Sequence, residues 1–476
     1  MSDIHQTRHE KLELLRNKGI DPFGGKFPIS TGIKELIEDF QEGKRVVIAG
    51  RLMAKRKHGK STFCDLRGET EKIQLYFKAD LVGDEKFEIL DSALDIGDII
   101  GVKGELFKTK TGEPTLKVED FTVLAKSLKP LPEKWHGLKD VETRYRQRYL
   151  DLIANQRVRE IFKIRCEIIK CIRSILDSKG YMEVETPMMQ SIPGGATGKP
   201  FKTHHDALDM DLYLRIAPEL YLKRLLVGGF EKVYEINKSF RNEGISTRHN
   251  PEFTMLEVYT AYGDCETTME LTKELIAETA RKVLGKEKLE YQGNIIDLAK
   301  WEKVSFAELM KKHYDINPDD DKKQLMQKLK KKGIEIIDEK EKVGKTQILN
   351  LVADLLTPKF DRPIFVIDIF RDLCPLAKVK KDNPLLTDRF ELFIGGIEVA
   401  NAYSELNDPI EQRKRFEEQR EDAELDEDFL RALEYGMPPA GGLGIGIDRL
   451  VMLFTDSPSI RDVILFPQLR KEKDSV

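Results

Sequence analysis

The feature that most constrains this chain is a change of pattern near residue 128. Between residues 44 and 124, short runs of β-forming residues alternate with glycines and charged turns, and Lys129-Pro130-Leu131-Pro132 then marks a linker. Five strands are expected, at Arg45–Arg51, Thr62–Leu66, Ile73–Phe77, Ile99–Gly104 and Thr115–Leu124. A helix-like segment, Glu85–Leu94, separates the third from the fourth. This order predicts a small five-stranded β-barrel with Greek-key connections.

The composition of the barrel region favours the oligonucleotide-binding (OB) type, with some other small β-barrel as the alternative. The segment Arg51–Lys60 carries five basic residues and no acid, and Phe63 and Tyr76-Phe77 lie on neighbouring expected strands. A basic loop beside exposed aromatic rings can bind phosphates by charge and bases by stacking. The competing interpretation of the basic run is a solvated hairpin loop.

After the linker, apolar residues recur at helical spacing from Val158 to Leu176, and Gly180 is placed to end that helix. Tyr181–Thr186 is predicted to be a strand, and mixed strands and helices follow to the C-terminus. A chain of 476 residues is expected to contain two or three domains. We expect an N-terminal helical segment (1–40), an OB barrel (41–127), a linker (128–150) and an α+β domain (151–476) with a helical, Lys-rich insertion around 265–360.

Composition excludes several classes of protein. The formal net charge of −4 argues against a nonspecific nucleic-acid coat, so local clusters must carry any polyanion binding. Five scattered cysteines without a CxxC pair predict neither a disulfide framework nor a zinc finger. The sequence has no apolar stretch of about 18 residues, and its N-terminus lacks the apolar core of a secretory signal. A reduced, cytoplasmic setting is therefore expected.

The block Phe240–Phe253 is the strongest candidate for a functional loop. It lies between two expected strands, Lys232–Phe240 and Phe253–Tyr259, and contains Arg241 and Arg248 among turn residues. Guanidinium groups match phosphate oxygens, so the loop predicts anion recognition, whereas an exposed charged hairpin is the alternative. Strand alternation places Phe253, Met255, Glu257 and Tyr259 on one face, which suits the floor of a ligand site.

A second acidic site is expected between residues 388 and 405. Gly395-Gly396 predicts a hairpin turn, with Glu391 on one arm and Glu398 on the other. Such carboxylates can share Mg²⁺, which prefers oxygen ligands; two exposed carboxylates are the alternative. Glu398 and Glu405 are seven residues apart, so plain alternation puts them on opposite faces, and a shared site requires a β-bulge between them.

The third block runs from Gly441 to Leu453. Its glycine-rich strand leads into a helix and places Arg449 near the helix N-terminus, where phosphate binding is favoured. Together the three blocks resemble the class II aminoacyl-tRNA synthetases over nearly the whole chain. The helix followed by Gly180–Pro187 resembles the first class motif, Phe240–Tyr259 the second and Gly441–Leu453 the third. The N-terminal barrel resembles the subgroup for lysine, aspartate and asparagine, and the runs Arg248–Met255 and Asn401–Asp408 resemble its lysine branch.

The resemblance implies an ATP-dependent ligase that activates L-lysine as an adenylate and transfers it to tRNA(Lys). It implies that Arg241 stabilises charge at the α-phosphate and that Arg449 covers the nucleotide near the γ-phosphate. It implies Mg²⁺ bound by Glu391 and Glu398, and no side-chain nucleophile. The ATP-binding residues implied are Arg241, Glu243, His249, Asn250, Phe253, Glu391, Glu398 and Arg449.

The same resemblance implies a lysine pocket. Its members are Gly195, Ala217, Glu219, Glu257, Tyr259, Asn401, Tyr403 and Glu405. Glu405 is the expected partner of the ε-ammonium, and Gly195 and Ala217-Pro218-Glu219 are expected at the α-amino end. In the barrel, the positions that resemble the anticodon-reading residues are Arg56, Phe63, Gln74 and Glu113. A homodimer, with no DNA or membrane partner, is also implied.

The sequence departs from the family in one segment. Ile369–Cys374 precedes Pro375-Leu376-Ala377-Lys378, where a Tyr-Pro pair followed by Glu and Ser is usual. A short N-terminus without a long basic extension favours the bacterial type. Three alternatives stay open: an enzyme that charges Asp or Asn, a paralogue that lysylates a protein, and a catalytically inactive RNA-binding regulator. Glu257 and Glu405 argue against the first, the barrel against the second, and intact Arg241, Glu398 and Arg449 against the third.

Overall fold

A computed structural model describes residues 3–132, 138, 140–196, 198–336, 343–355, 362–418 and 425–471. The chain forms two compact units, Met1–Gln156 and Arg157–Val476. Part of the predicted linker, at 133–137 and 139, lies outside the described residues. Among the helices described, none is both long and apolar enough to cross a membrane.

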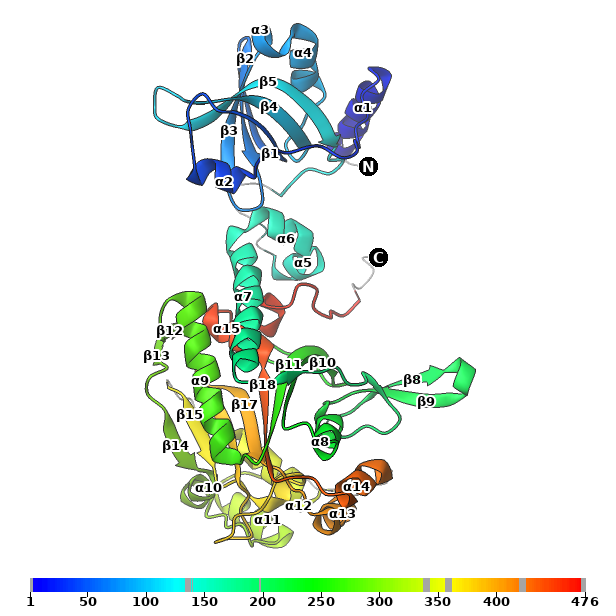
Figure 1. Ribbon diagram of the computed structural model, residues 1–476, viewed down its shortest axis with the longest axis vertical. Helices are drawn as coiled ribbons and strands as arrows, with labels where there is room; N and C mark the ends of the chain where they lie inside the picture. The colour runs from blue at the N-terminus through cyan, green and yellow to red at the C-terminus, as the bar shows by residue number, and fades with distance from the viewer. Residues whose placement is uncertain are drawn as a thin grey trace. The chain divides into compact units, whose positions relative to one another are not determined.

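The first unit is built on a closed five-stranded barrel, as predicted (Figure 1). Its strand order is β1-β2-β3-β5-β4, with β3 and β5 parallel and the other pairs antiparallel. The strands are β1 (Arg45–His58), β2 (Ser61–Arg67), β3 (Lys72–Lys78), β4 (Ile99–Lys108) and β5 (Pro114–Ala125). Alternate residues point inward, so Ile48, Leu75 and Val102 are fully buried in the barrel core.

Short helices accompany the barrel. They are α1 (Asp3–Asn17), α2 (Ile33–Glu38), α3 (Ala79–Val82), α4 (Asp84–Ser92), α5 (Val141–Arg146) and α6 (Arg148–Ala154). The predicted helical segment between the third and fourth strands is confirmed as α4, preceded by the single turn α3. Leu15 of α1 and Leu90 of α4 are fully buried against the barrel core, so these helices are part of one hydrophobic cluster.

The second unit contains an eight-stranded, mainly antiparallel sheet, as predicted. Its order is β14-β15-β16-β17-β18-β11-β10-β6, and only the pairs at the two ends, β14–β15 and β10–β6, are parallel. The strands are β6 (Met182–Glu183), β10 (Lys232–Phe240), β11 (Glu252–Ala261), β14 (Glu302–Ser305), β15 (Ile364–Ile367), β16 (Arg389–Ile394), β17 (Ile397–Ser404) and β18 (Ala440–Gly446). The strand predicted at 181–186 is therefore shorter than expected, because only Met182–Glu183 pairs with β10.

One face of this sheet is covered by helices. Helices α7 (Gln156–Ser178), α9 (Cys265–Leu284) and α15 (Ile447–Phe454) share a hydrophobic core with Leu256 and Val258 of β11. Asp264 caps the start of α9 by accepting a hydrogen bond from the Thr267 amide, and Gly285, at φ +69°, ends it. Gly180, at φ +78°, follows the end of α7 as predicted.

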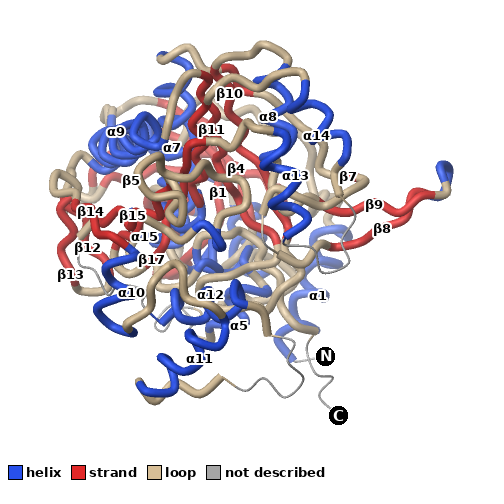
Figure 2. The backbone as a smooth tube through the Cα atoms, turned by 90° about the horizontal axis from the view of Figure 1, so that it is seen from below, coloured by secondary structure: helices blue, strands red, loops and turns tan. Residues whose placement is uncertain are grey.

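The opposite face of the sheet carries the candidate site. Helix α8 (Glu219–Val227) packs against β10 and β11, and α14 (Glu427–Glu434) packs against α8 and α13 (Pro409–Glu418). Figure 1 shows these three helices gathered away from α7 and α9. A hairpin of β8 (Phe201–His205) and β9 (Met210–Leu214) extends outward in both views of the chain (Figures 1 and 2). It pairs with β7 (Met189–Gln190) in a small separate sheet.

The segment 265–360 holds four helices and three strands in its described part. Besides α9 and β14, these are β12 (Lys288–Tyr291), β13 (Asn294–Asp297), α10 (Phe306–Tyr314), α11 (Lys322–Lys331) and α12 (Lys345–Leu355). Because β14 pairs with β15 and α9 packs on the sheet, part of this segment belongs to the main core. Helices α10 to α12 pack in a second cluster around Met310, Leu325 and Leu349, which also includes residues of β15 and β16. The limits of an insertion stay a prediction.

Candidate active site

Two adjoining cavities lie on the open face of the sheet. The larger has a volume of about 480 Å³ and the smaller about 170 Å³. They share five lining residues: Arg241, Met255, Glu398, Asn401 and Gly444. The two cavities are therefore neighbouring parts of one site, joined at Arg241 and Glu398.

The smaller cavity is lined by the loop between β10 and β11. Glu243, His249, Asn250 and Phe253 all border it, together with Arg241 at the end of β10. The loop is held by backbone hydrogen bonds from Arg241 to the Pro251 carbonyl (2.9 Å) and from Ser246 to that of His249 (3.1 Å). The ATP-binding residues expected from this loop thus share one cavity.

The electrostatics of this cavity suit an anion. The Arg241 guanidinium lies 5.2 Å from the centre of the Phe253 ring, and Nε of Arg241 has no hydrogen-bond partner among the described residues. Burial lowers the pKa of Arg241, but the group remains a cation near neutrality. Burial, and secondarily the charge of Arg449, lowers the pKa of His249, so its imidazole is neutral at pH 7.

Arg449 enters the same cavity from the third residue of α15, as predicted. Its Nη1 donates to the backbone oxygen of Glu398 (2.7 Å) and to Oε2 of the same residue (3.1 Å). The next residue back, Asp448, is buried and accepts hydrogen bonds from the Thr254 amide (2.7 Å) and Arg165 (2.6 Å). These bonds fix the start of α15 to β11 and α7, and they hold Arg449 at the cavity.

The β-bulge that a shared acidic site requires is present. Leu392 pairs with Ala400, whereas the next residue, Phe393, pairs with Glu398, so Val399 is the extra residue of β17. The bulge reverses the alternation, and Glu398 lines the same cavity as Asn401, Tyr403 and Glu405. Gly395 and Gly396, both at positive φ, form the predicted turn between β16 and β17.

The two expected Mg²⁺ ligands lie on this hairpin. Glu391 is paired in register with Asn401 and so lies on the same face of the sheet, but it lines neither cavity. Oε1 of Glu391 accepts a hydrogen bond from Arg389 (2.8 Å), while Oε2 of Glu398 is 3.1 Å from Arg449. The described residues contain no group of three or more acidic, His or Cys side chains arranged to hold a metal ion. Two carboxylates on facing arms nevertheless fit a cation that completes its shell with phosphate and water oxygens.

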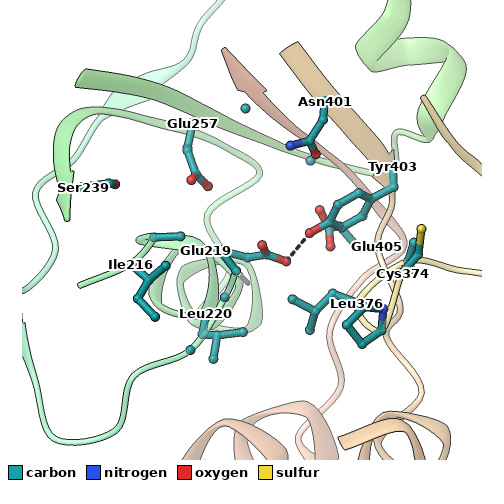
Figure 3. A pocket seen from close by; sticks show the side chains of 18 of the residues that line it. Ile216, Glu219, Leu220, Ser239, Glu257, Cys374, Leu376, Asn401, Tyr403 and Glu405 are labelled. Atoms are coloured by element: carbon teal, nitrogen blue, oxygen red, sulfur yellow. Dashed lines mark hydrogen bonds between the residues drawn. The ribbon is translucent and has the colours of Figure 1, made fainter. Parts of the chain in front are cut away.

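All eight expected lysine-pocket residues line the larger cavity. Figure 3 shows the carboxylates of Glu219 and Glu257, with the Tyr403 ring and Glu405 beyond them. The Tyr403 hydroxyl donates to Oε1 of Glu219 at 2.5 Å, and the Tyr259 hydroxyl donates to Oε2 of Glu257 at 3.1 Å. Burial, reinforced by the charge of Glu219, raises the pKa of Glu257 to about 8.

Glu405, the expected partner of a substrate ammonium, already has a cationic neighbour. Nζ of Lys223 lies 2.5 Å from its Oε2 and 2.8 Å from Oε1 of Glu219, and Lys223 and Glu405 are both 0% exposed. Burial raises the pKa of Glu405 to about 8 although Lys223 opposes that change. Sequence reasoning missed Lys223; its signal was the four-residue spacing from Glu219, which places both on one side of α8.

Glycines shape the walls of this cavity. A Cβ atom at Gly442 of β18 would lie 1.8 Å from Oε1 of Glu405 and 2.8 Å from the Tyr259 ring, so the carboxylate occupies the space a side chain would fill. Gly195 has a positive φ of +85°. A Cβ atom at this position would lie 3.1 Å from the Cβ of Glu219 and 3.5 Å from that of Ala217. The residues expected at the α-amino end are therefore adjacent.

The segment Ile369–Cys374, which differs from the usual family sequence, contains the short 3₁₀ turn η2 (Arg371–Leu373) at the edge of the larger cavity. Leu373 and Cys374 line it, and Arg389 donates to Sγ of Cys374 at 2.9 Å. Arg389 was also missed from the sequence, because an arginine on a strand gives no signal that separates a cavity wall from an exposed edge. Its pairing with Glu391 and Cys374 places it in the cavity wall.

Three of the four barrel residues, Arg56, Phe63 and Gln74, lie on the neighbouring strands β1, β2 and β3, and Glu113 immediately precedes β5. Arg56 pairs in register with Phe63, and Phe63 pairs with Tyr76, whose ring centre is 5.0 Å away. Gln74 accepts a hydrogen bond from the Thr115 hydroxyl (3.0 Å), two residues after Glu113. Phe63, Tyr76 and Phe107 form a half-buried aromatic row, which a stacked base can extend.

Comparison with known proteins agrees with this architecture. Residues 46–124 match the family described as OB-fold nucleic acid binding domain, and residues 140–470 match the family described as tRNA synthetases class II (D, K and N). The chain belongs to this class II tRNA synthetase family.

Within this family, the chain is similar over nearly its whole length to proteins that carry one name. A protein named "Lysine--tRNA ligase" from Pelotomaculum thermopropionicum is 54% identical over 99% of this chain and 95% of its own length. Proteins of the same name from Carboxydothermus hydrogenoformans and Syntrophomonas wolfei are 54% and 53% identical, each over 99% of this chain and at least 97% of its own length.

Proposed function

We propose that this chain is a lysine–tRNA ligase, which activates L-lysine with ATP and transfers it to the terminal adenosine of tRNA(Lys). The observation that carries the proposal is the larger cavity. It gathers the carboxylates of Glu219, Glu257 and Glu405 at one end and opens at Arg241 into a second cavity with Arg449. A substrate with two ammonium groups and a reacting carboxylate matches that distribution of charge.

In this proposal the acidic end selects the amino acid. Glu219, with Gly195 and Ala217 beside it, receives the α-ammonium, and Glu257 and Glu405 face the ε-ammonium across the cavity. Tyr259, Asn401 and Tyr403 complete its walls. An aspartate or asparagine side chain would bring an acceptor or a second negative charge to these carboxylates, which is unfavourable in a closed site.

Activation needs positioning and charge stabilisation. A carboxylate oxygen of lysine attacks the α-phosphorus of ATP, the bond from that phosphorus to the bridging oxygen breaks, and pyrophosphate leaves with the bond electrons. Arg241, at the junction of the cavities, stabilises the negative charge that grows on the phosphoryl oxygens. Phe253 and the Glu243–Asn250 loop border the space for the nucleoside, and Arg449 lies on its other side. A ribose hydroxyl of tRNA then displaces AMP from the acyl carbon.

Glu391 and Glu398 are the residues that would hold Mg²⁺. When bound, the ion supplies neutralisation of the pyrophosphate charge. Of the two carboxylates, Glu398 borders both cavities, which supports its placement beside the phosphates.

The barrel supports the tRNA part of the proposal. Phe63 offers a ring for stacking, Arg56 and Gln74 offer hydrogen-bonding groups on the strands beside it, and Glu113 offers one just before β5. We further propose a cytoplasmic homodimer without DNA or membrane partners. Several apolar side chains are exposed: Met188 and Met189 in the segment that follows α7, and Phe466 near the C-terminus. These exposed residues support a second copy of this chain as partner.

The test is ATP–pyrophosphate exchange with each of the twenty amino acids, with and without Mg²⁺. Exchange with lysine alone, dependent on Mg²⁺, is the expected result. Exchange with aspartate or asparagine would keep the fold and overturn the pocket assignment. No exchange from folded protein would favour the regulatory RNA-binding alternative.

A further inference from the structure

Lys223 is a buried cation that the proposed reaction does not use directly. It lies on α8, one turn after Glu219, and its side chain is 0% exposed. Burying an ammonium group is costly unless its neighbours compensate for the lost hydration. The neighbours of Lys223 therefore indicate why it is there.

Those neighbours all belong to the lysine end of the cavity. Nζ of Lys223 lies 2.8 Å from Glu219, 2.5 Å from Glu405 and 5.5 Å from the centre of the Tyr403 ring. The Tyr403 hydroxyl donates to the same Glu219 carboxylate. Lys223 thus contacts two of the three carboxylates and the Tyr403 ring. Figure 3 shows the Tyr403 hydroxyl bonded to Glu219, with Glu405 close to the ring.

The contacts have short distances but poor angles. Nζ of Lys223 and both carboxylate oxygens of Glu405 lack a hydrogen bond of acceptable geometry to any described residue. A buried ion pair stabilises a fold only when its geometry is good and its remaining lone pairs are satisfied. This cluster meets neither condition, so its arrangement is suited to receive a further partner.

The charges of the cluster indicate that partner. When ionised, Glu219, Glu257 and Glu405 contribute three negative charges and Lys223 one positive charge, which leaves two negative charges. Lysine, the substrate in the proposed function, brings two ammonium groups, while its carboxylate faces Arg241. With Lys223 in place, the pocket and the bound substrate are neutral together.

We propose that Lys223 is a positioning residue that sets the pocket charge to match a substrate with two ammonium groups, by holding the carboxylates of Glu219 and Glu405 toward the cavity. This inference rests on the proposed function. It makes lysine selectivity depend on a residue that does not touch lysine.

The expected consequence is a shift in pH dependence. Titratable or charged groups that face Glu405 and its partners come from every surrounding element: Glu219 and Lys223 of α8, Glu257 and Tyr259 of β11, Tyr403 of β17, Arg241 after β10 and Arg389 of β16. Lys223 is the cation whose attraction lowers the pKa of Glu405 against burial. Its removal is expected to move the acid limb of kcat/KM for lysine upward by about 1–3 pH units.

The experiment compares wild type with Lys223→Met in lysine-dependent ATP–pyrophosphate exchange from about pH 6 to pH 10, a range that spans the raised pKa of Glu405 and its expected upward shift. We expect a higher KM for lysine at pH 7, an unchanged KM for ATP and partial recovery at the alkaline end. The matched control is Lys126→Met, which removes another fully buried lysine, paired with Asp95 and Asp98 of the barrel unit. Its acid limb is expected to stay at the wild-type position.

Two further variants make the test independent of the stability of Lys223→Met. Glu405→Gln is compared with Lys223→Met/Glu405→Gln, in which the buried pair is replaced by neutral groups and the fold is expected to persist. If Lys223 acts through charge, the acid limb of the double variant lies above that of Glu405→Gln, because Glu219 and Glu257 lose its attraction. Coincident limbs, or a uniform loss of kcat/KM at every pH, would overturn this inference while lysine exchange by wild type upheld the function. Wild-type exchange with another amino acid instead of lysine would overturn both.

Discussion

Two lysines among the described residues have side chains with no exposed surface, and they contrast in how their carboxylate partners are satisfied. In the barrel unit, Lys126 donates hydrogen bonds to Asp95 (2.6 Å) and Asp98 (2.9 Å), and Asp98 also accepts from the backbone amides of Asp95 and Ser127 (2.8 Å each). In the catalytic unit, Lys223 lies just as close to Glu405, yet neither oxygen of Glu405 has a hydrogen bond among the described residues.

This difference separates a structural ion pair from one that prepares a binding site. Burial alone would raise the pKa of Asp95. Hydrogen bonds from Lys11 and Lys126 outweigh that effect, so the pKa of Asp95 is lower than its ordinary value. For Glu405 the balance is reversed, and burial raises its pKa to about 8. A satisfied carboxylate is stable as an ion in the free protein, whereas Glu405 gains from the arrival of another cation.

The largest expected effect tests the structural pair. Lys126→Met leaves the buried Asp98 carboxylate without its cation, and breaking such a pair costs about 3–5 kcal/mol. We expect faster hydrogen–deuterium exchange in residues 45–125 of the full chain, measured by mass spectrometry. Lysine-dependent pyrophosphate exchange should be unchanged at a temperature where the variant is folded. Unaltered amide exchange would remove the distinction between the two lysines.

The next effect tests the binding pair. Glu257→Gln removes a carboxylate that is expected to meet the ε-ammonium, and truncating one partner of a buried charge pair costs about 2–5 kcal/mol in binding. The loss should appear in kcat/KM for lysine, measured by pyrophosphate exchange. Thermal stability without lysine should not fall, because the neutral amide has a smaller desolvation cost than the carboxylate. A large loss of stability with normal kcat/KM would assign Glu257 a structural role.

A smaller effect is expected from Gly442→Ala. The added methyl group would lie 1.8 Å from Oε1 of Glu405, and Lys223 and the cavity walls limit how far that carboxylate can move. Overpacking of this kind costs about 1–3 kcal/mol. We expect a higher KM for lysine with little change in KM for ATP. Gly444→Ala, on the same strand at the junction of the two cavities, is the comparison, since its Cβ would meet the end of the Met255 side chain at 3.3 Å and the Asn401 backbone oxygen at 3.9 Å. Equal effects of the two substitutions would contradict the role of Gly442.

The last effect concerns the pH dependence of stability, which is small per pH unit but accumulates between the folded and unfolded pKa values. The pKa of Glu257 is about 8 in the folded protein and about 4.3 in an unfolded chain. Its contribution to stability is therefore fully present below about pH 4.3 and is lost as the pH rises through about 8, with a slope of about 1 kcal/mol per pH unit. Asp95, whose pKa is lowered, contributes with the opposite sign: its contribution is present above its unfolded pKa and lost as the pH falls through the folded value.

The measurement is the melting temperature of wild type minus that of Glu257→Gln, followed across this range without lysine. The difference should decrease as the pH rises toward 8, and saturating lysine should reduce the decrease. A difference that is independent of pH would mean that Glu257 is already ionised in the free protein.

Much of the fold could be predicted because its signals are local. Lys232–Phe240 was predicted to the residue as a strand, since its limits coincide with charged and turn residues. The need for a bulge between Glu398 and Glu405 followed from the two-residue period of a strand, and Val399 provides it. The short pairing of Met182–Glu183 could not be foreseen, because strand length there depends on how far β10 extends beside it.

Site residues whose role depends on neighbours that are distant in the sequence were harder to predict. The eight residues expected at the lysine end all line one cavity, which the resemblance to a family made possible. Lys223 resembles any surface lysine in sequence, and only the fold places it against Glu405 from another element, 182 positions later in the chain. Its spacing from Glu219 predicts a shared side of α8, but its burial is a tertiary property that no local pattern reports.

The bulge at Val399 also has a consequence for engineering the substrate range of this chain. On its C-terminal side, Tyr403 and Glu405 line only the amino-acid cavity, whereas Glu398 on its N-terminal side borders the nucleotide cavity as well. The extra residue therefore separates two functional parts of this segment. A library that varies positions 403 and 405 can change the choice of amino acid while the residues that line the nucleotide cavity are left as they are.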